Sequence, residues 1–398
     1  MTDHAIRVSS QQREPKVSPI NDPKVRSIFF QILTALIVVL AVWWISHNVS
    51  VNLARANIAS GYGFLSGRSG FDIGFAMLPY SSDSTYGDAL VVGLINTILI
   101  AITGVFTATI IGFIIGIGRL SRNWLIAKLC TVYVEVFRNI PPLLVIFFWY
   151  SGVLATLPQV RDSLKLPFSM FLNNRGLAFP KPLWGEGSYL IPIAILIAIV
   201  ATVVIAKWAK KRQMRTGKQF HTIWVGLALI FGLPIVTFLA IGAPLTFDYP
   251  VAGRFNLSGG SVIAPEFVAL YLALSFYTAA FIAEIIRAGI RGVPKGQSEA
   301  SFALGLQPNS TTRLVVIPQA MRIIIPPLTS QYLNLTKNSS LGVAIGFPEL
   351  VSTGGTTMNQ TGQAVEVISI WLVVYLTISI ATSLFMNWFN AKMALVER

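Results

Sequence analysis

The residues whose types could do chemistry are few, because charged side chains are rare in the apolar stretches of this chain. Those that fall inside such stretches are Glu135, Arg138, Glu284 and Lys337. A charge within a membrane span is costly and often marks the path of a polar solute. One interpretation is that some of them line a path for a zwitterionic solute, with Arg138, Glu284 and Lys337 as candidates. The other is local pairing at helical i,i+3 spacing. Glu135 would then pair with Arg138, and Glu284 with Arg287.

Lys337 lies in a polar segment, residues 334–340, of an expected span that Pro326-Pro327 interrupts. Non-helical backbone at membrane depth is tolerated only where it faces protein or a water-filled cavity. Contact with a transported solute and a purely structural role both stay open for this lysine.

Motifs of common catalytic sites are missing from the sequence. There is no Gly-x-x-x-x-Gly-Lys-Ser/Thr phosphate loop, no nucleophile elbow and no His-Glu-x-x-His. The single cysteine, Cys130, excludes a disulfide framework and a cysteine-based metal cluster. The three histidines, His4, His47 and His221, are far apart in the sequence. We therefore expect no catalytic residues, no metal, no cofactor and no ATP hydrolysis by this chain itself.

The elements that position the candidate residues are predicted to lie in lipid. The 398 residues are 54% hydrophobic and 12% charged, whereas soluble domains have about 25% charged residues. The mean hydropathy is +0.67. The net charge of +14 is assigned to membrane topology and to contact with anionic lipid rather than to nucleic acid.

Apolar runs predict an all-α polytopic membrane protein with about eight transmembrane helices. The expected spans are residues 27–45, 89–117, 131–157, 188–206, 222–241, 267–286, 319–346 and 367–389. Residues 1–26 are expected to form a cytoplasmic tail. Residues 112–116 contain a Gly-x-x-x-Gly pair, which either lets two helices approach closely or occurs by chance.

Charge asymmetry predicts the orientation of these spans. With the N-terminus inside, the inner segments hold 21 of the lysines and arginines and the outer loops hold 7. Cytoplasmic segments carry such an excess of basic residues. The prediction therefore places both termini in the cytoplasm.

The longest segment of the C-terminal half that cannot lie in lipid is residues 291–318. Pro294 can open a short helix and Gly305 can close it, and a second short helix can run from Pro308 to the residue before Pro318. Two short helices with small residues on one face would make a docking surface. An ordinary loop between two spans is the alternative.

This segment resembles the cytoplasmic "EAA" loop of bacterial ABC-importer permeases. The family pattern is Glu-Ala-Ala, three residues, Gly, nine residues, Ile, one residue, Leu-Pro. The matching positions here are Glu299, Ala300, Ser301, Gly305, Val315, Ile317 and Pro318. Three of them depart from the pattern but keep small size or apolar character. The resemblance implies coupling helices that seat in a separate ATPase subunit, with Glu299, Ala300, Ser301, Gly305 and Pro318 as the contact residues.

The resemblance extends to the neighbouring spans. Residues 133–143 and 279–297 are similar to the Glu-x-x-Arg-Gly-Thr-Pro segment and the Glu-x-x-Arg-Gly-Gly-Ile run of polar amino-acid permeases. Residues 317–323 and 337–341 are similar to their Leu-Pro-Gln-Ala-x-Arg and Lys-(Asp/Asn)-(Ser/Thr)-Ser-Leu segments. The enlarged layout resembles the permeases of general L-amino-acid importers of Gram-negative bacteria.

The resemblance implies a five-helix permease core in two parts, residues 89–157 and 266–398, with a coupling loop at 287–318. An extra first span and periplasmic loop occupy 27–88, and inserted loops and two spans occupy 158–265. The implied partners are ATP-binding subunits, a second homologous permease subunit and a periplasmic amino-acid-binding protein. The implied location is the bacterial inner membrane.

Two alternatives from other classes stay open at this point. An ion-coupled secondary transporter would need a coupling-ion site and paired broken helices, and only the seventh expected span is broken. A membrane-embedded enzyme or an assembly protein would need ionisable residues clustered at one depth. Neither the substrate side chain nor the identity of the partner permease is readable from the sequence.

Overall fold

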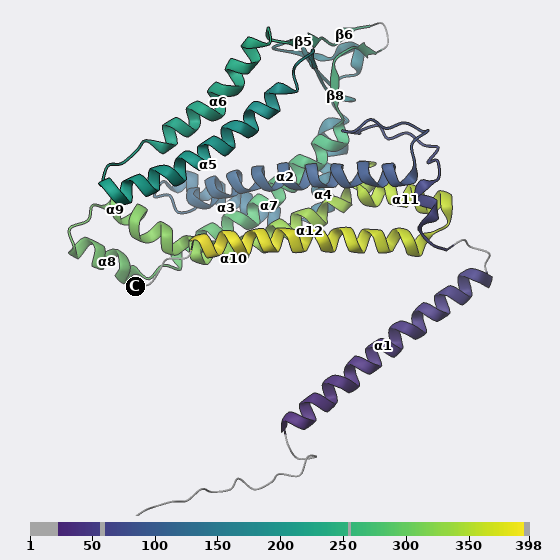
Figure 1. Cartoon of the computed structure of the whole chain (residues 1–398), viewed down its shortest axis with the longest axis horizontal. Helices are drawn as coiled ribbons and strands as arrows, with labels where there is room; N and C mark the ends of the chain where they lie inside the picture. The colour runs from purple at the N-terminus through teal and green to yellow at the C-terminus, as the bar shows by residue number, and fades with distance from the viewer. Residues whose placement is uncertain (1–22, 56–59, 254–255, 394–398) are drawn as a thin grey trace, which may run out of the picture.

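The computed structural model describes residues 23–55, 60–253 and 256–393. Of the expected tail, residues 1–22 lie outside the described residues. Residues 23–26 form the first turn of helix α1, Pro23–Arg55. In Figure 1 this helix stands apart from the remainder of the described chain. Its side chains are largely exposed and apolar, which suits contact with lipid.

The all-α membrane architecture is confirmed. Six helices are long and apolar enough to cross a membrane, or up to seven spans if a bent helix pair counts as one. The six are α1, α2 (Tyr86–Gly118), α5 (Leu190–Thr216), α6 (Thr222–Ala240), α7 (Pro265–Arg291) and α12 (Ala364–Met393). The seventh expected span corresponds to α10, Ile317–Asn338, which carries too many polar residues to qualify on hydropathy.

The third expected span is broken rather than straight. Helix α3, Trp124–Asn139, ends before Pro141, and α4, Pro142–Phe147, continues into the π-helix η2, Phe148–Leu154, after a bend of 110°. Ile140 at the break has extended backbone (φ −105°, ψ 134°). A residue before proline is driven out of the α region, so the Pro141-Pro142 pair accounts for the bend.

The seventh expected span differs from its prediction in where it breaks. Helix α10 runs straight through Pro326 and Pro327, and regular helix ends only at Asn338. A 3₁₀ segment, η5 (Ser339–Ile345), follows, and then the short helix α11 (Leu350–Thr361). Membrane helices tolerate proline when surrounding groups satisfy the freed backbone. Lys337 therefore lies on a helix and not on broken backbone.

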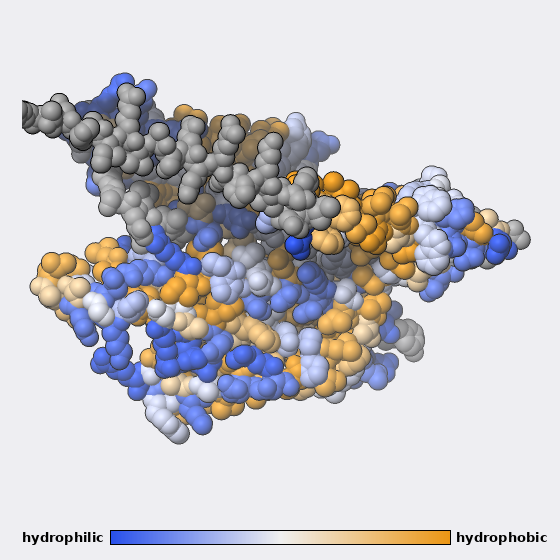
Figure 2. Space-filling view, turned by 90° about the horizontal axis from the view of Figure 1, so that it is seen from below, coloured by the Kyte–Doolittle hydropathy of each residue, from blue (hydrophilic) through white to orange (hydrophobic). Residues whose placement is uncertain are grey.

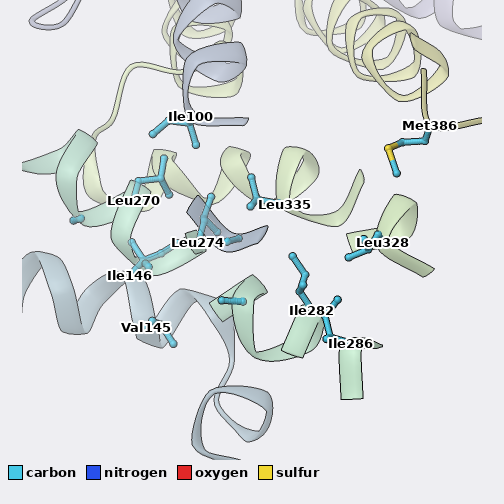
Figure 3. Close-up of a cluster of buried hydrophobic side chains, with 14 of the residues drawn as sticks. Ile100, Val145, Ile146, Leu270, Leu274, Ile282, Ile286, Leu328, Leu335 and Met386 are labelled. Carbon is cyan, nitrogen blue, oxygen red and sulfur yellow. The ribbon is translucent and has the colours of Figure 1, made fainter. Parts of the chain in front are cut away.

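Helix α7 is the centre of the bundle. In its most apolar 18-residue stretch, which we call its membrane window, 61% is buried inside the protein, whereas the corresponding share for α2 is 28%. Gly112 and Gly116 of α2 face α7 so closely that an added Cβ would lie 2.5 Å from Ile282 and 2.8 Å from Ile286. Of the two interpretations of this glycine pair, close helix packing is thus the correct one. Figure 3 shows apolar side chains that converge from α2, α4, α7, α10 and α12.

The inserted loops contain short strands, which the sequence analysis did not predict. A four-stranded antiparallel sheet has the order β1 (Leu164–Leu166), β2 (Met170–Asn173), β3 (Gly176–Phe179) and β8 (Ser261–Ile263). Two further pairs join β4 (Lys181–Trp184) to β5 (Leu245–Asp248), and β6 (Val251–Ala252) to β7 (Leu257–Ser258). We call these strands and their connections the β cap.

The β cap ties the two inserted loops to each other and to the core. Leu177 of β3 pairs with Ile263 of β8, and α7 begins directly after β8 at Pro265. The cap therefore lies at the N-terminal end of α7, opposite the end where α8 follows. Figure 1 shows the α5–α6 hairpin running from the cap along the outside of the bundle. Its two membrane windows are only 11% and 6% buried.

The hairpin also differs from prediction in length. Helix α5 continues to Thr216, so residues 207–215, which follow the expected span 188–206, are also helical. Gly217 ends the helix in the left-handed conformation (φ 69°). Most large apolar side chains of α5 and α6 are exposed, and Figure 2 shows broad hydrophobic areas on the face of the molecule that it presents.

Candidate functional site

The segment after α7 folds into a projecting pair of short helices. Helix α8 covers Lys295–Ala303, with Pro294 as its N-cap residue, and α9 covers Pro308–Thr311. Gly305 sits between them at φ +78°, a conformation that residues with a side chain rarely adopt. The predicted roles of Pro294 and Gly305 in bounding the first helix are confirmed. We call residues 294–316 the α8–α9 surface.

We expected the second short helix to stop before Pro318, but it does not. The π-helix η4, Thr312–Val316, follows α9 without a break and leads directly into α10. Pro318 is the second residue of α10, which begins directly after η4. Motion of the α8–α9 surface would therefore pass to α10 through continuous helical backbone.

Ser301 is the buried pivot of this surface. Its side chain lies between α8 and α9, and the residue is 4% exposed. The hydroxyl donates to the Ser298 carbonyl (2.7 Å) and lies within hydrogen-bond distance of the Thr311 hydroxyl (3.0 Å), and Thr311 is itself 2% exposed. Where the family pattern has alanine, this chain thus holds its two short helices together with a buried hydrogen bond, worth about 1 kcal/mol.

The outward face of the surface combines apolar side chains with one acid. Phe302, Leu304 and Leu314 are 49%, 82% and 64% exposed. Glu299 and Ala300 are exposed on α8. Within the described residues, the Glu299 carboxylate has no ion-pair or hydrogen-bond partner. An exposed apolar patch with an unpaired charge at its edge is typical of a docking site.

A charge cluster joins three helices near the start of this surface. Glu284 of α7 accepts from Arg119, just after α2, and from Arg287, whose Nε lies 3.2 Å from its carboxylate. The Arg119 side chain is only 9% exposed and also approaches Glu135 of α3 at 3.9 Å. The pairing of Glu284 with Arg287 is confirmed. The pairing of Glu135 with Arg138 is wrong, because Glu135 faces Arg119 instead.

Arg138 lies apart from this cluster. Its guanidinium sits over the ring of Phe281 on α7, 5.7 Å from the ring centroid. A cation over an aromatic face is attracted by the ring quadrupole. Glu135 approaches Arg119 and not Arg138. Arg138 is exposed at the bend before Pro141.

A polar cavity of about 300 Å³ lies between α7, α10 and the start of α4. Its lining residues are Pro142, Tyr277, Thr278, Phe281, Gln331, Asn334 and Asn338. Three amides from one face of α10 thus meet two aromatic rings of α7. Sequence analysis noted only that this stretch of α10 is polar, and it did not identify the amides as a lining.

The three candidate path residues have different relations to this cavity. Arg138 touches it indirectly, through Phe281. Lys337 is exposed between Asn334 and Asn338 on α10. Glu284 is held by two arginines, one turn further along α7 than Phe281. No ion pair connects the three within the described chain.

These features define a class: a multi-pass membrane protein with a projecting, partly apolar surface beside its helix bundle. The chain belongs to the family of binding-protein-dependent transport system inner membrane components, whose model matches residues 108–395. It is therefore a multi-pass inner-membrane transport protein. This family membership argues against both the secondary transporter and the membrane enzyme.

Several relatives are similar over nearly their whole length. The general L-amino acid transport system permease protein AapQ of Rhizobium johnstonii is 71% identical over 381 residues, which are 96% of this chain and 95% of that protein. The putative amino-acid ABC transporter permease protein YhdX of Escherichia coli is 49% identical, covering 95% of this chain and 96% of that protein. The glutamate/glutamine/aspartate/asparagine transport system permease protein BztB of Rhodobacter capsulatus is 40% identical, covering 95% and 96%.

Proposed function

We propose that this chain is the permease subunit of an ATP-driven, binding-protein-dependent importer of L-amino acids across the bacterial inner membrane. The observation that carries the proposal is the α8–α9 surface, which is exposed, apolar and continuous with α10. The names of the similar permeases, all of them for amino-acid transport, support the substrate class.

The proposed partners are two ATP-binding subunits, a second homologous permease subunit and a periplasmic amino-acid-binding protein. The α8–α9 surface would face the cytoplasm, as would both termini, in agreement with the excess of basic residues in the inner segments. ATP hydrolysis would belong to the separate subunits. This chain would act as the gate.

Coupling follows from how the surface is built. Ser301 and Thr311 hold α8 against α9, so a push on one helix moves both. The η4 segment then carries the displacement into α10, which lines the polar cavity. Packed helices respond to such a push by discrete rigid-body shifts rather than by bending continuously.

The solute path would run along the cavity between α7 and α10. Amide side chains can exchange hydrogen bonds with a polar solute without holding it as tightly as a charge would. Arg138 contacts the lining residue Phe281, Lys337 precedes the lining residue Asn338, and Glu284 lies three residues after Phe281 on α7. Unchanged amino-acid uptake by a Lys337→Met variant would make that lysine structural only.

The test of the proposal changes the α8–α9 surface without touching the membrane part. Glu299→Lys reverses an exposed charge, and Gly305→Arg places a large side chain where φ is positive. Both variants should insert normally but recover at least tenfold less ATPase subunit on co-purification. The matched control is Glu186→Lys, which reverses an exposed charge beside the β cap. Normal recovery and normal uptake in both variants would refute the docking role.

A further inference from the structure

A second cavity, of about 420 Å³, lies where the β cap meets the N-terminal end of the core. Its volume falls within the roughly 300–1,000 Å³ typical of small-molecule sites. Arg175 of the cap and Glu266 of α7 both line it. The rest of the lining is mostly small or apolar and includes Gly74, Ala155, Val262 and Ala264.

Arg175 is positioned by the turn between β2 and β3. Its backbone N–H donates to Asn173 Oδ1 (2.8 Å), and Asn173 is 2% exposed. One guanidinium nitrogen donates to Asn256 Oδ1 (2.5 Å). A guanidinium has five N–H donors, and no other acceptor contacts this one within the described residues. The side chain is thus oriented and still has donors available for a carboxylate.

Glu266 is positioned by the first turn of α7 and by the π-helix η2. Tyr150 of η2 donates to Glu266 Oε1 at 3.0 Å. The second carboxylate oxygen has no partner in the part of the chain that the structure describes. π-Helical turns are frequent at functional sites, and here the turn brings the tyrosine to the acid.

Arg175 and Glu266 share one cavity but form no ion pair with each other in the described chain. Opposite charges held apart in this way match the two ends of a zwitterion. Glu266 also lines a neighbouring hollow of about 350 Å³ that reaches Ser352 and Thr353 of α11. That hollow gives room for a side chain of variable size.

We propose that this cavity binds a free α-amino acid by its main-chain groups, with Arg175 on the carboxylate and Glu266 on the ammonium. The inference rests on the proposed function, because the cavity would be a binding site at the periplasmic end of the same solute path. It assigns a role to the insertion: the cap supplies the cationic half of the site and the core supplies the anionic half. Since neither charge contacts the solute's side chain, such a site accepts many amino acids.

The experiment uses spheroplasts that contain the complete importer, with Cys130→Ala as background and Val262→Cys as a probe. Val262 lines the cavity and is 51% exposed. A membrane-impermeant thiol reagent should label it, and L-alanine should slow labelling several-fold. Ethylamine and propionate, which each lack one of the two main-chain charges, should protect at least tenfold less well. The control probe, Val251→Cys on β6 outside the cavity, is 60% exposed and should not be protected.

Variants of the two charges complete the test. Arg175→Met and Glu266→Gln should each raise the alanine concentration for half-protection about tenfold or more. Glutamine keeps an acceptor for Tyr150, so the bond from η2 survives. Arg161→Met, an exposed cation three residues before β1 and outside the cavity, should change nothing.

Equal protection by alanine, ethylamine and propionate, or no effect of either variant, would overturn the inference. ATP-driven uptake is measured in the same cells to separate this outcome from failure of the importer proposal. Normal ATP-driven uptake without protection at Val262→Cys would reject the cavity alone. Loss of ATP dependence would reject the importer.

Discussion

Helix α7 and the two helices of the α5–α6 hairpin all qualify as membrane spans, but they behave as opposites in the fold. The membrane window of α7 is 61% buried inside the chain, whereas those of α5 and α6 are 11% and 6% buried. Helix α7 is the least apolar of the three, yet it is the one that the protein surrounds. The difference lies in small residues, such as Gly112 and Gly116 of α2, that allow neighbouring helices to pack closely around α7.

The comparison shows where the protein depends on shape and where it depends only on being apolar. Close packing against Gly112 and Gly116 fixes the position of α7, and a close-packed interior responds to a change of one methylene. The hairpin contacts mainly itself, and Gly226 of α6 meets Thr202 of α5. Its outward side chains face lipid, where another apolar side chain of similar size serves as well.

The largest expected effect comes from filling the α2–α7 contact. Gly112→Leu would drive a side chain into Ile282 and should destabilise the protein by about 3 kcal/mol, because overpacking forces backbone shifts. Gly232→Leu in α6 is the matched control, since nothing lies within 4 Å of its added Cβ. The midpoint of thermal denaturation in detergent measures both. Equal loss of stability in the two variants would erase the contrast between α7 and the hairpin.

A smaller effect is expected from the charge cluster. Arg119→Met removes one of the two cations that hold Glu284, so we expect a loss of about 2 kcal/mol, typical of a hydrogen bond to a charged group. Arg215→Met on α5 removes an exposed cation and should cost almost nothing. The midpoint of thermal denaturation in detergent, together with the amount of ATP-binding subunit that co-purifies, distinguishes the two variants. An Arg119→Met protein of unchanged stability would mean that the charge cluster does not stabilise the packing of α7.

The smallest effect is expected on the lipid-facing side of the hairpin. Phe231→Leu in α6 changes a side chain that is 62% exposed and should alter stability by less than about 0.5 kcal/mol. The same change at Phe347, which is 0% exposed, should cost about 1–2 kcal/mol through the cavity it leaves. A larger loss at Phe231 than at Phe347 would show that the hairpin has a specific protein partner.

Much of the architecture could be predicted from the sequence, because apolar runs of span length identify membrane helices one at a time. The bounds of α8 were predictable for a similar reason, since Pro294 and Gly305 act locally. The 110° break at Pro141-Pro142 and the continuity of α10 through Pro326-Pro327 were not. Whether a proline ends a helix depends on neighbours that satisfy the freed backbone, and those neighbours come from other helices.

Contacts between distant residues account for most of what the sequence did not reveal. Arg119 and Glu284 are 165 positions apart, so the sequence does not show that they pair. Without Arg119 in view, i,i+3 spacing favoured Arg138 as the partner of Glu135. The strands of the β cap have two to four residues each, too few for a periodic pattern. Ser301 is one of the three departures from the family pattern that the sequence shows. Its partner Thr311 follows only from the fold.

The most direct test of the account is amino-acid uptake by proteoliposomes that contain this chain with its partner permease and binding protein. The account predicts uptake that requires both the ATP-binding subunit and ATP, and that falls when Glu299→Lys prevents the subunit from docking. Uptake driven by an ion gradient in the absence of any ATP-binding subunit would contradict it.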